Sequence, residues 1–112
     1  DRLAAARAAA RQLGCIVVLK GAATVTAAPN GEAWINPTGN AGMASGGMGD
    51  VLTGVLAALV AGGATPLGAA VAGVYLHGLA GDRAAAELGP RGLLAGDLLD
   101  RLPAALGELL RD

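Results

Sequence analysis

The sequence predicts an α/β fold with the element order α-β-β-β-α-α-α, and three patterns predict it. An alanine-rich segment with arginines at helical spacing precedes a continuous apolar run, residues 15–19. Asn30-Gly31 separates two strand-like runs. A stretch without charged residues, 51–81, is divided by the breaker residues 62–66. Each half is shorter than the ~20 residues of a membrane span, so we expect two packed helices of a soluble protein.

The composition of the 112 residues excludes several classes of protein. Hydrophobic residues make up 54%, whereas a disordered polar chain contains few. The net charge of -1 excludes a general nucleic-acid binder, which needs a basic surface. The single cysteine, Cys15, excludes a disulfide framework and is expected to be a buried, inert thiol. The N-terminus has no signal-peptide layout and no starting Met, so we expect the chain to begin inside a longer, cytoplasmic polypeptide.

The first half of the chain predicts one helix, one buried strand and a hairpin. Residues 2–13 form a helix that Gly14 ends. The uninterrupted apolar run 15–19 is typical of a strand buried on both faces of a parallel sheet. Residues 24–28 and 32–36 flank Asn30-Gly31, whose tolerance of positive φ predicts a β-hairpin.

The second half predicts a glycine-rich loop and three helices. Residues 37–49 are almost all turn formers, and a helix opens at Asp50. A second helix covers residues 66–88, with small residues on one face that permit close packing. Pro103 kinks or splits a last helix over residues 94–110. One parallel strand and a hairpin are too little sheet for three helices, so we expect the C-terminal part of a larger α/β domain.

The strongest functional signal is the loop 45–50, directly before an apolar helix. Its glycines let successive N–H groups turn into one concavity, and the helix N-terminus adds partial positive charge, so the loop suits a phosphate. Asp50 has two interpretations here. It is an N-cap, which is common, or a general base that takes a hydroxyl proton beside the anion. The loop alone leaves both open.

Lys20, the only lysine, ends the predicted central strand. Ligands of open α/β sheets bind beyond the carboxyl ends of strands. Gly21 allows close approach of the backbone and Thr24 supplies a hydroxyl, so this strand tip also suits a nucleotide phosphate. The alternative is a surface lysine that ends the strand. The glycine-rich pattern followed by Lys-Ser/Thr is absent, which excludes a P-loop enzyme.

Three segments carry a resemblance to a known family: residues 20–24 with Asn36, residues 39–54, and residues 77–98. They resemble the ADP-dependent NAD(P)H-hydrate dehydratases, repair enzymes of the ribokinase-like superfamily. The resemblance implies the C-terminal part of a ribokinase-like three-layer fold, with residues 1–112 as a partial domain whose N-terminal portion is absent. It also implies dehydration of hydrated NADH or NADPH, driven by ADP or ATP and assisted by Mg²⁺.

The resemblance assigns roles to single positions. Asp50 contacts the hydrated nicotinamide ring and deprotonates its hydroxyl, and the loop from Gly46 to Asp50 holds the nucleotide phosphate. The expected ADP-binding residues are Lys20, Gly21, Ala22, Ala23, Thr24, Asn40, Ala41, Gly42, Met43, Ala44, Ser45, Gly46, Gly47, Met48 and Gly49. No residue is assigned as a metal ligand.

Two other functions remain open. One is a small-molecule kinase of the same superfamily, acting on an alcohol such as a thiamine precursor, and the other is a nucleotide-binding module without catalysis. The expected partners are small-molecule nucleotides, the missing N-terminal half of the domain and further copies in a homo-oligomer, with no nucleic acid and no membrane. We expect the isolated chain to hold only a half-site.

Several further side chains are given structural roles. His77 is expected to pack in the core, with contact to adenine as the alternative that the resemblance implies. Asp82 is expected to pair with Arg83 or Arg91, or to lie beneath the nucleotide. Asp97 is expected at the start of the last helix. Met43 and Met48 are expected to fill space beside the loop, and Trp34 is expected to be a half-buried strand residue.

Overall fold

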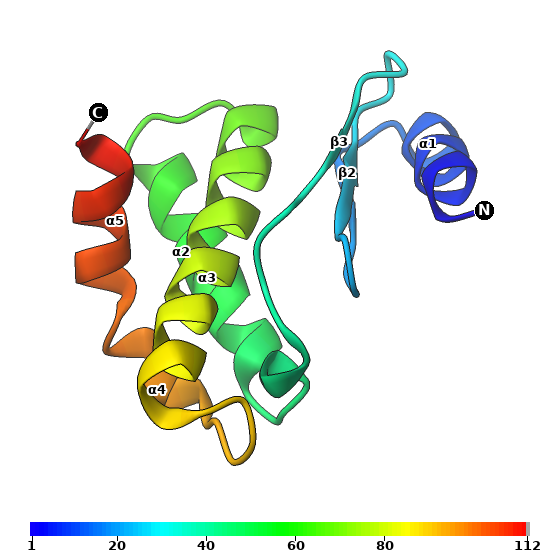
Figure 1. Ribbon diagram of the computed structural model, residues 1–112. Coiled ribbons are helices and arrows are strands. Elements are labelled where there is room, and N and C mark those ends of the chain that lie inside the picture. The colour runs from blue at the N-terminus through cyan, green and yellow to red at the C-terminus, as the bar shows by residue number, and fades with distance from the viewer. Residues whose placement is uncertain (112) are drawn as a thin grey trace.

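The computed structural model describes residues 1–111, so Asp112, the last residue of the expected domain, lies outside the described residues. The elements form two regions joined by an extended segment (Figure 1). The sheet region consists of helix α1 and three short strands, and the helical region consists of α2 to α5. We call residues 36–47, which connect the two, the linker segment.

The sheet region begins with α1 (Arg2–Leu13), at the bounds that the sequence predicts. The Asp1 carboxylate accepts a hydrogen bond from the Ala4 N–H at 2.8 Å and caps the helix, which Gly14 ends at φ 68°. Strands β1 (Val17–Leu19), β2 (Val25–Ala27) and β3 (Ala33–Ile35) pair antiparallel in the order β1-β2-β3. A small core of Ala6, Ala10, Val25 and Ala27 joins α1 to the sheet.

Strand β1 is less buried than the sequence predicts. Its three residues are half-buried, and among residues 1–111 its strand partner is the antiparallel β2. The prediction of a strand buried on both faces of a parallel sheet is therefore wrong for the described chain, because α1 covers one face and β2 one edge (Figure 1). Cys15 is also exposed rather than buried, because it lies in the bend between α1 and β1.

The β2–β3 hairpin is confirmed. Val25 pairs with Ile35, and the turn contains Gly31 at φ 96°. Asn30 closes the turn with its side chain, since its Oδ1 accepts from the Glu32 N–H at 2.9 Å. Trp34 on β3 is 52% exposed.

The charge-free stretch forms two helices, as predicted. Helix α2 (Met48–Ala61) begins two residues before the expected start, and α3 (Pro66–Leu88) has the expected bounds. The Thr65 hydroxyl caps α3 by accepting from the Gly68 N–H at 3.1 Å. Within residues 1–111, no helix has both the length and the apolar character needed to traverse a bilayer.

The last predicted helix is split. Helices α4 (Ala95–Leu99) and α5 (Leu102–Leu110) replace it, with Pro103 in the first turn of α5, where a missing N–H costs little. Asp97 lies at the start of this part as expected, because its carboxylate accepts from the Leu94 N–H at 2.9 Å. The observed order therefore differs from the predicted one by this split and by a short 3₁₀ helix, η1 (Ala41–Met43).

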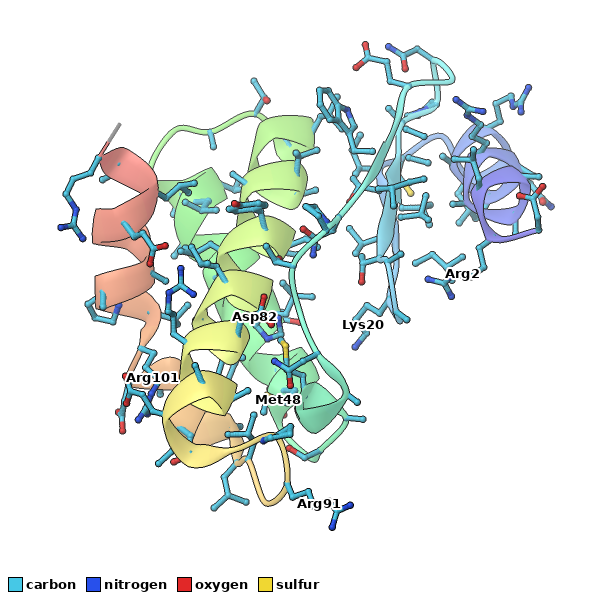
Figure 2. All side chains as sticks on the ribbon, viewed as in Figure 1. Arg2, Lys20, Met48, Asp82, Arg91 and Arg101 are labelled. Atoms are coloured by element: carbon cyan, nitrogen blue, oxygen red, sulfur yellow. The ribbon has the colours of Figure 1, made fainter. Side chains whose placement is uncertain are left out.

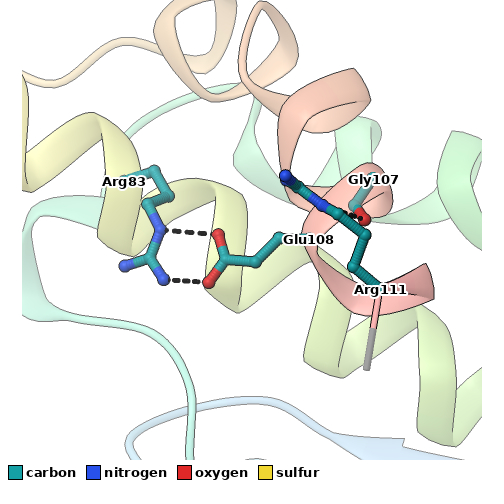
Figure 3. Close-up of polar contacts among 4 residues, drawn as sticks. All are labelled: Arg83, Gly107, Glu108 and Arg111. Carbon is teal, nitrogen blue, oxygen red and sulfur yellow. Dashed lines mark hydrogen bonds and ion pairs between the residues drawn. The ribbon is translucent and has the colours of Figure 1, made fainter.

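An exposed ion pair joins α5 to α3. Arg83 donates from Nε to Glu108 Oε2 at 2.9 Å, and a second nitrogen contacts the other carboxylate oxygen (Figure 3). The hydrogen bonds, with the opposite charge, raise the pKa of Arg83 and lower the pKa of Glu108. Arg111 folds back and donates to the Gly107 carbonyl at 3.1 Å (Figure 3).

The core of the helical region is the larger of the two. Its buried residues are Met48, Val55, Leu76, Leu79, Ala80, Ala84, Leu93, Leu98 and Ala105. Glycines of α3 let the linker segment pack closely, because a Cβ on Gly78 would collide with Thr38, and one on Gly81 with Met43. The predicted small-residue face of α3 is therefore confirmed, and it fixes the linker segment against the helices.

Candidate functional site

A cavity of about 880 Å³ lies between the two regions. The turn after β1 contributes residues 20–24, the linker segment contributes most of its residues, and α2 and α3 contribute the side opposite the sheet. Of the sixteen predicted site residues, thirteen line this cavity, and the remaining three are Gly42, Gly47 and Asp50. The structure thus brings together the strand tip and the glycine-rich loop, which are separated in the sequence.

Lys20 lies directly against the start of α2. A Cβ built on Gly49 would be 2.8 Å from the Lys20 Nζ, so the ammonium reaches the first turn of this helix (Figure 2). Arg2 supports the strand tip from α1, because its guanidinium donates to the carbonyls of Leu19 at 3.1 Å and Lys20 at 3.4 Å. Lys20 is exposed at the end of its strand and its charge also faces the first turn of α2, so both interpretations of this residue remain predictions. We call residues 39–50 the anion loop.

The turn after Lys20 is held by its own polar groups. The Thr24 hydroxyl donates to the Gly21 carbonyl at 3.0 Å and accepts from the Gly21 N–H at 3.3 Å. Gly21 has φ 146° and Ala23 φ 54°, so the backbone bends sharply here. Thr24 therefore shapes the strand tip through this turn.

Helix α2 presents its N-terminus to the same cavity. Its N-cap is Gly47, at φ 88° and without a side chain to satisfy the first amides. The Gly49 and Asp50 N–H groups have no carbonyl acceptor within residues 1–111, as is usual in a first turn. Asp50 occupies the third helical position, so its interpretation as the N-cap is wrong. Its side chain is exposed and does not line the cavity.

Ser45 supplies a second unsatisfied group. The residue lines the cavity, and its buried Oγ has no hydrogen-bond partner within the described chain. A buried hydroxyl without a partner carries a desolvation cost that a bound polar ligand would remove. Together with the free amides of α2 and the Lys20 ammonium, it makes a donor set that fits a phosphate group.

His77 lines the cavity from α3 and is 8% exposed. Its Nε2 lies 3.0 Å from the Met48 carbonyl at the start of α2. Burial lowers the pKa of His77 and outweighs the hydrogen bond to Met48, which raises it, and the nearby Lys20 charge lowers it further. The imidazole is therefore neutral at pH 7, and Nε2 carries the proton that it donates to Met48. The expected packing role is confirmed.

Comparison with known proteins places this site in a family. The chain matches the Carb_kinase family model, described as NAD(P)H-hydrate dehydratase, over residues 1–104. The chain belongs to the NAD(P)H-hydrate dehydratase family. The resemblance that the sequence motifs predict is therefore confirmed.

Two curated relatives and one solved structure illustrate the similarity. A bifunctional NAD(P)H-hydrate repair enzyme Nnr from Moorella thermoacetica is 54% identical over 109 residues, 97% of this chain and 21% of that protein. An ADP-dependent (S)-NAD(P)H-hydrate dehydratase from Bacillus subtilis is 44% identical over 94 residues, 84% of this chain and 34% of that protein. A crystal structure of ADP/ATP-dependent NAD(P)H-hydrate dehydratase from Bacillus subtilis, co-crystallized with ATP/Mg²⁺ and soaked with CoA, matches with a TM-score of 0.92 and 40% identity. That match covers 96% of this chain and 40% of the other, so the chain spans well under half the length of these relatives.

Residues 1–111 offer no protein cage for a metal ion. Within residues 1–111, no group of three His, Cys, Asp or Glu side chains could hold one. Mg²⁺ commonly keeps several waters and is bound through substrate phosphates with one or two carboxylates. The residues present therefore fit magnesium only as a companion of the nucleotide phosphates.

For Asp82 the sequence left two roles open, an ion pair with an arginine and a structural role under the nucleotide. The expected pair with Arg83 or Arg91 is wrong, because the carboxylate instead accepts from the Gly39 N–H at 3.1 Å and from Asn40 Nδ2 at 2.9 Å. These partners lie more than forty positions away, at the base of the anion loop. Asp82 and its two partners lie in segments that resemble the family, which was the signal available in the sequence. Their spacing alone did not predict that they contact one another.

Proposed function

We propose that this chain is the nucleotide-holding, C-terminal part of a three-layer dehydratase domain that converts hydrated NADH or NADPH to the normal cofactor, driven by ADP or ATP. The single observation that carries the proposal is the Lys20 ammonium against the first turn of α2, beside a cavity with an unsatisfied serine hydroxyl. The named relatives support the choice of reaction, since they are described as ADP-dependent (S)-NAD(P)H-hydrate dehydratases and repair enzymes.

In this proposal the strand tip and the anion loop hold the phosphates. The Lys20 charge offsets the negative charge of the nucleotide, and the Gly49 and Asp50 amides with the Ser45 hydroxyl donate hydrogen bonds. The other predicted ADP-binding residues line the cavity around the nucleotide, except Gly42 and Gly47, which would shape the loop. The ring hydroxyl oxygen would attack the terminal phosphorus of the nucleotide, which forms a ring phosphate ester and releases AMP from ADP or ADP from ATP. The C–O bond of the ester would then break with loss of a ring proton, because phosphate is a far better leaving group than hydroxide.

Asp50 is proposed as the catalytic base. It stands in the first turn of α2 with its carboxylate exposed beside the loop, free to take the proton of the ring hydroxyl. The amides of the same turn stabilise the charge that develops on the transferred group. Since Asp50 does not line the cavity, the hydrated ring would bind beside Asp50 and within reach of the terminal phosphate, against a segment that precedes this chain.

Three further features belong to the same proposal. The segment preceding the chain would complete the sheet and the substrate pocket, which fits the 40% of the solved relative that the chain covers. Complete copies would assemble as a homo-oligomer, and exposed leucines on α5 such as Leu106, Leu109 and Leu110 support this. The protein would act in the cytoplasm, where nucleotide cofactors are repaired.

The test uses the product of the complete reading frame. With ADP or ATP and Mg²⁺, it should restore the absorbance of NADH from hydrated NADH. Asp50→Asn should lower that rate about 10²–10⁴-fold while ADP affinity is kept, because a general base contributes about this much. Asp100→Asn, an exposed carboxylate at the end of α4, is the matched control and should leave the rate unchanged.

Three results would reject the proposal. Phosphorylation of an added alcohol without restored absorbance would identify a kinase. Nucleotide binding without either reaction would identify a binding module. An unchanged rate in Asp50→Asn would remove the base from the mechanism.

A further inference from the structure

Asp82 holds the base of the anion loop from behind. It projects from α3 toward the linker segment (Figure 2), and it does not line the cavity, whereas both of its partners do. One carboxylate oxygen accepts from the Gly39 N–H at 3.1 Å and the other accepts from Asn40 Nδ2 at 2.9 Å. Each oxygen therefore holds a different donor of the loop.

The contact with Asn40 fixes a third hydrogen bond. Because the Asn40 amide nitrogen faces the carboxylate, its Oδ1 faces the other way and accepts from the Gly42 N–H at 2.9 Å. That bond caps η1, the short helix that leads into residues 45–50. A chain of two hydrogen bonds thus runs from Asp82 through Asn40 to Gly42 in η1, and a separate bond holds Gly39.

The geometry points to Asp82 as a positioning residue that keeps the loop in its nucleotide-binding conformation, an inference that rests on the proposed nucleotide-binding function. Gly39 has φ 108°, a conformation that favours glycine, and the Asp82 carboxylate accepts from its N–H in that conformation. The close packing of Met43 on Gly81, one residue before Asp82, fixes the other side of η1. The Asp82 carboxylate therefore holds the loop through hydrogen bonds, and Met43 holds it through apolar packing.

This role predicts a particular kinetic signature. If the loop is competent for only a fraction of the time, the apparent dissociation constant of the nucleotide rises by the inverse of that fraction. Saturating nucleotide restores the competent state, so kcat is kept. A residue that only stabilises the fold would instead lower the amount of folded protein and the melting temperature, and leave KM for ADP unchanged.

The test compares three variants of the complete reading-frame product. Asp82→Asn keeps the shape but loses one acceptor, Asp82→Ala loses both, and Glu87→Gln removes another α3 carboxylate, which pairs with Arg101 away from the loop. We expect Asp82→Ala to raise KM for ADP about tenfold or more at constant kcat, since charge-assisted hydrogen bonds are lost. Asp82→Asn should raise it less, and Glu87→Gln should not change it.

Amide hydrogen exchange gives a readout that does not depend on activity. Exchange at Gly39 and Gly42 should accelerate in Asp82→Ala and Asp82→Asn but not in Glu87→Gln. The exchanged pair Asp82→Asn with Asn40→Asp offers the same number of donors and acceptors and should restore this protection. Unchanged exchange and KM in Asp82→Ala, or a loss of melting temperature and kcat at constant KM, would overturn the inference. If the unmodified protein binds ADP but does not dehydrate hydrated NADH, the proposed function is rejected. The inference about Asp82 is then tested by the ADP affinities of the variants, measured by calorimetry.

Discussion

The sheet region and the helical region contribute to one site but are built very differently. The helical core contains leucines, valine and methionine, and Leu98 is fully buried, whereas three of the four buried residues of the sheet core are alanines. The strands are three residues each, and the linker segment packs on α3 rather than on the sheet. The anion loop is therefore held by the region with the larger core, whereas Lys20, whose ammonium faces the loop, lies in the region with the smaller core.

This difference indicates which part of the site is more easily disturbed by substitutions. The loop geometry depends on the hydrogen bonds of Asp82 and on close packing against α3 and the segment around Pro90 and Leu93. The position of Lys20 depends on α1, through Arg2, and on strands that three alanines and a valine hold together. Destabilising substitutions in the sheet region should therefore displace the Lys20 ammonium before they change the conformation of the anion loop.

The largest expected effect separates the two cores. Leu98→Ala should destabilise the chain by about 2–5 kcal/mol, because it removes a fully buried leucine. Val25→Ala in the sheet region removes two carbons and should cost about 1.6 kcal/mol. Urea unfolding of the two variants measures both values. A larger loss in Val25→Ala than in Leu98→Ala would break the comparison.

A smaller effect tests the contact between the regions. Gly49→Ala places a methyl group 2.8 Å from the Lys20 Nζ, so the flexible ammonium must move away from α2. We expect ADP affinity to fall about tenfold, which corresponds to about 1.4 kcal/mol, with little change in stability. Calorimetric titration with ADP measures the change.

Gly54 provides the matched control in the same helix. A Cβ at Gly54 meets nothing within 4 Å, so Gly54→Ala should leave ADP affinity unchanged. It should stabilise the chain by about 0.5–1 kcal/mol, because alanine is the better helix former. Equal ADP affinities in the two variants would show that Lys20 and α2 do not cooperate.

The smallest expected effect is the pH dependence that His77 gives to the helical region. Burial lowers its pKa, so the unfolded chain binds more protons between the lowered value and 6.5. Stability should be complete above about pH 6.5 and decrease as the pH falls toward the lowered pKa. His77→Gln, which can still donate to Met48, should flatten this window in urea unfolding at pH 5 to 7.5. The same slope in the variant would assign the effect to another group.

Local patterns predicted most of the elements. Gly14, Pro66 and the Asn30-Gly31 turn act through neighbours in the sequence, so these helix ends and the hairpin could be predicted. The burial of β1 could not be predicted in the same way, because burial of a strand depends on partners that periodicity does not specify. The start of α2 was placed two residues late because Asp50 looked like a cap, whereas Gly47 fills that position without a side chain.

The site was predictable in its parts and not in its assembly. The loop and the strand tip each carried a chemical signal, and the structure lines one cavity with most of both. The contacts of Asp82 with Gly39 and Asn40 join distant positions, so no local rule could find them. The roles of the predicted residues in binding and catalysis remain predictions.

The most direct test of the central claim is a calorimetric comparison of ADP and adenosine binding to the complete reading-frame product and to its Lys20→Met variant. Methionine keeps the unbranched stem of Lys20 and removes the charge that faces α2. The variant should bind ADP at least about tenfold more weakly, with a smaller salt dependence, and should bind adenosine as before. Unchanged ADP affinity, or an equal loss for adenosine, would contradict a phosphate site between the strand tip and the anion loop.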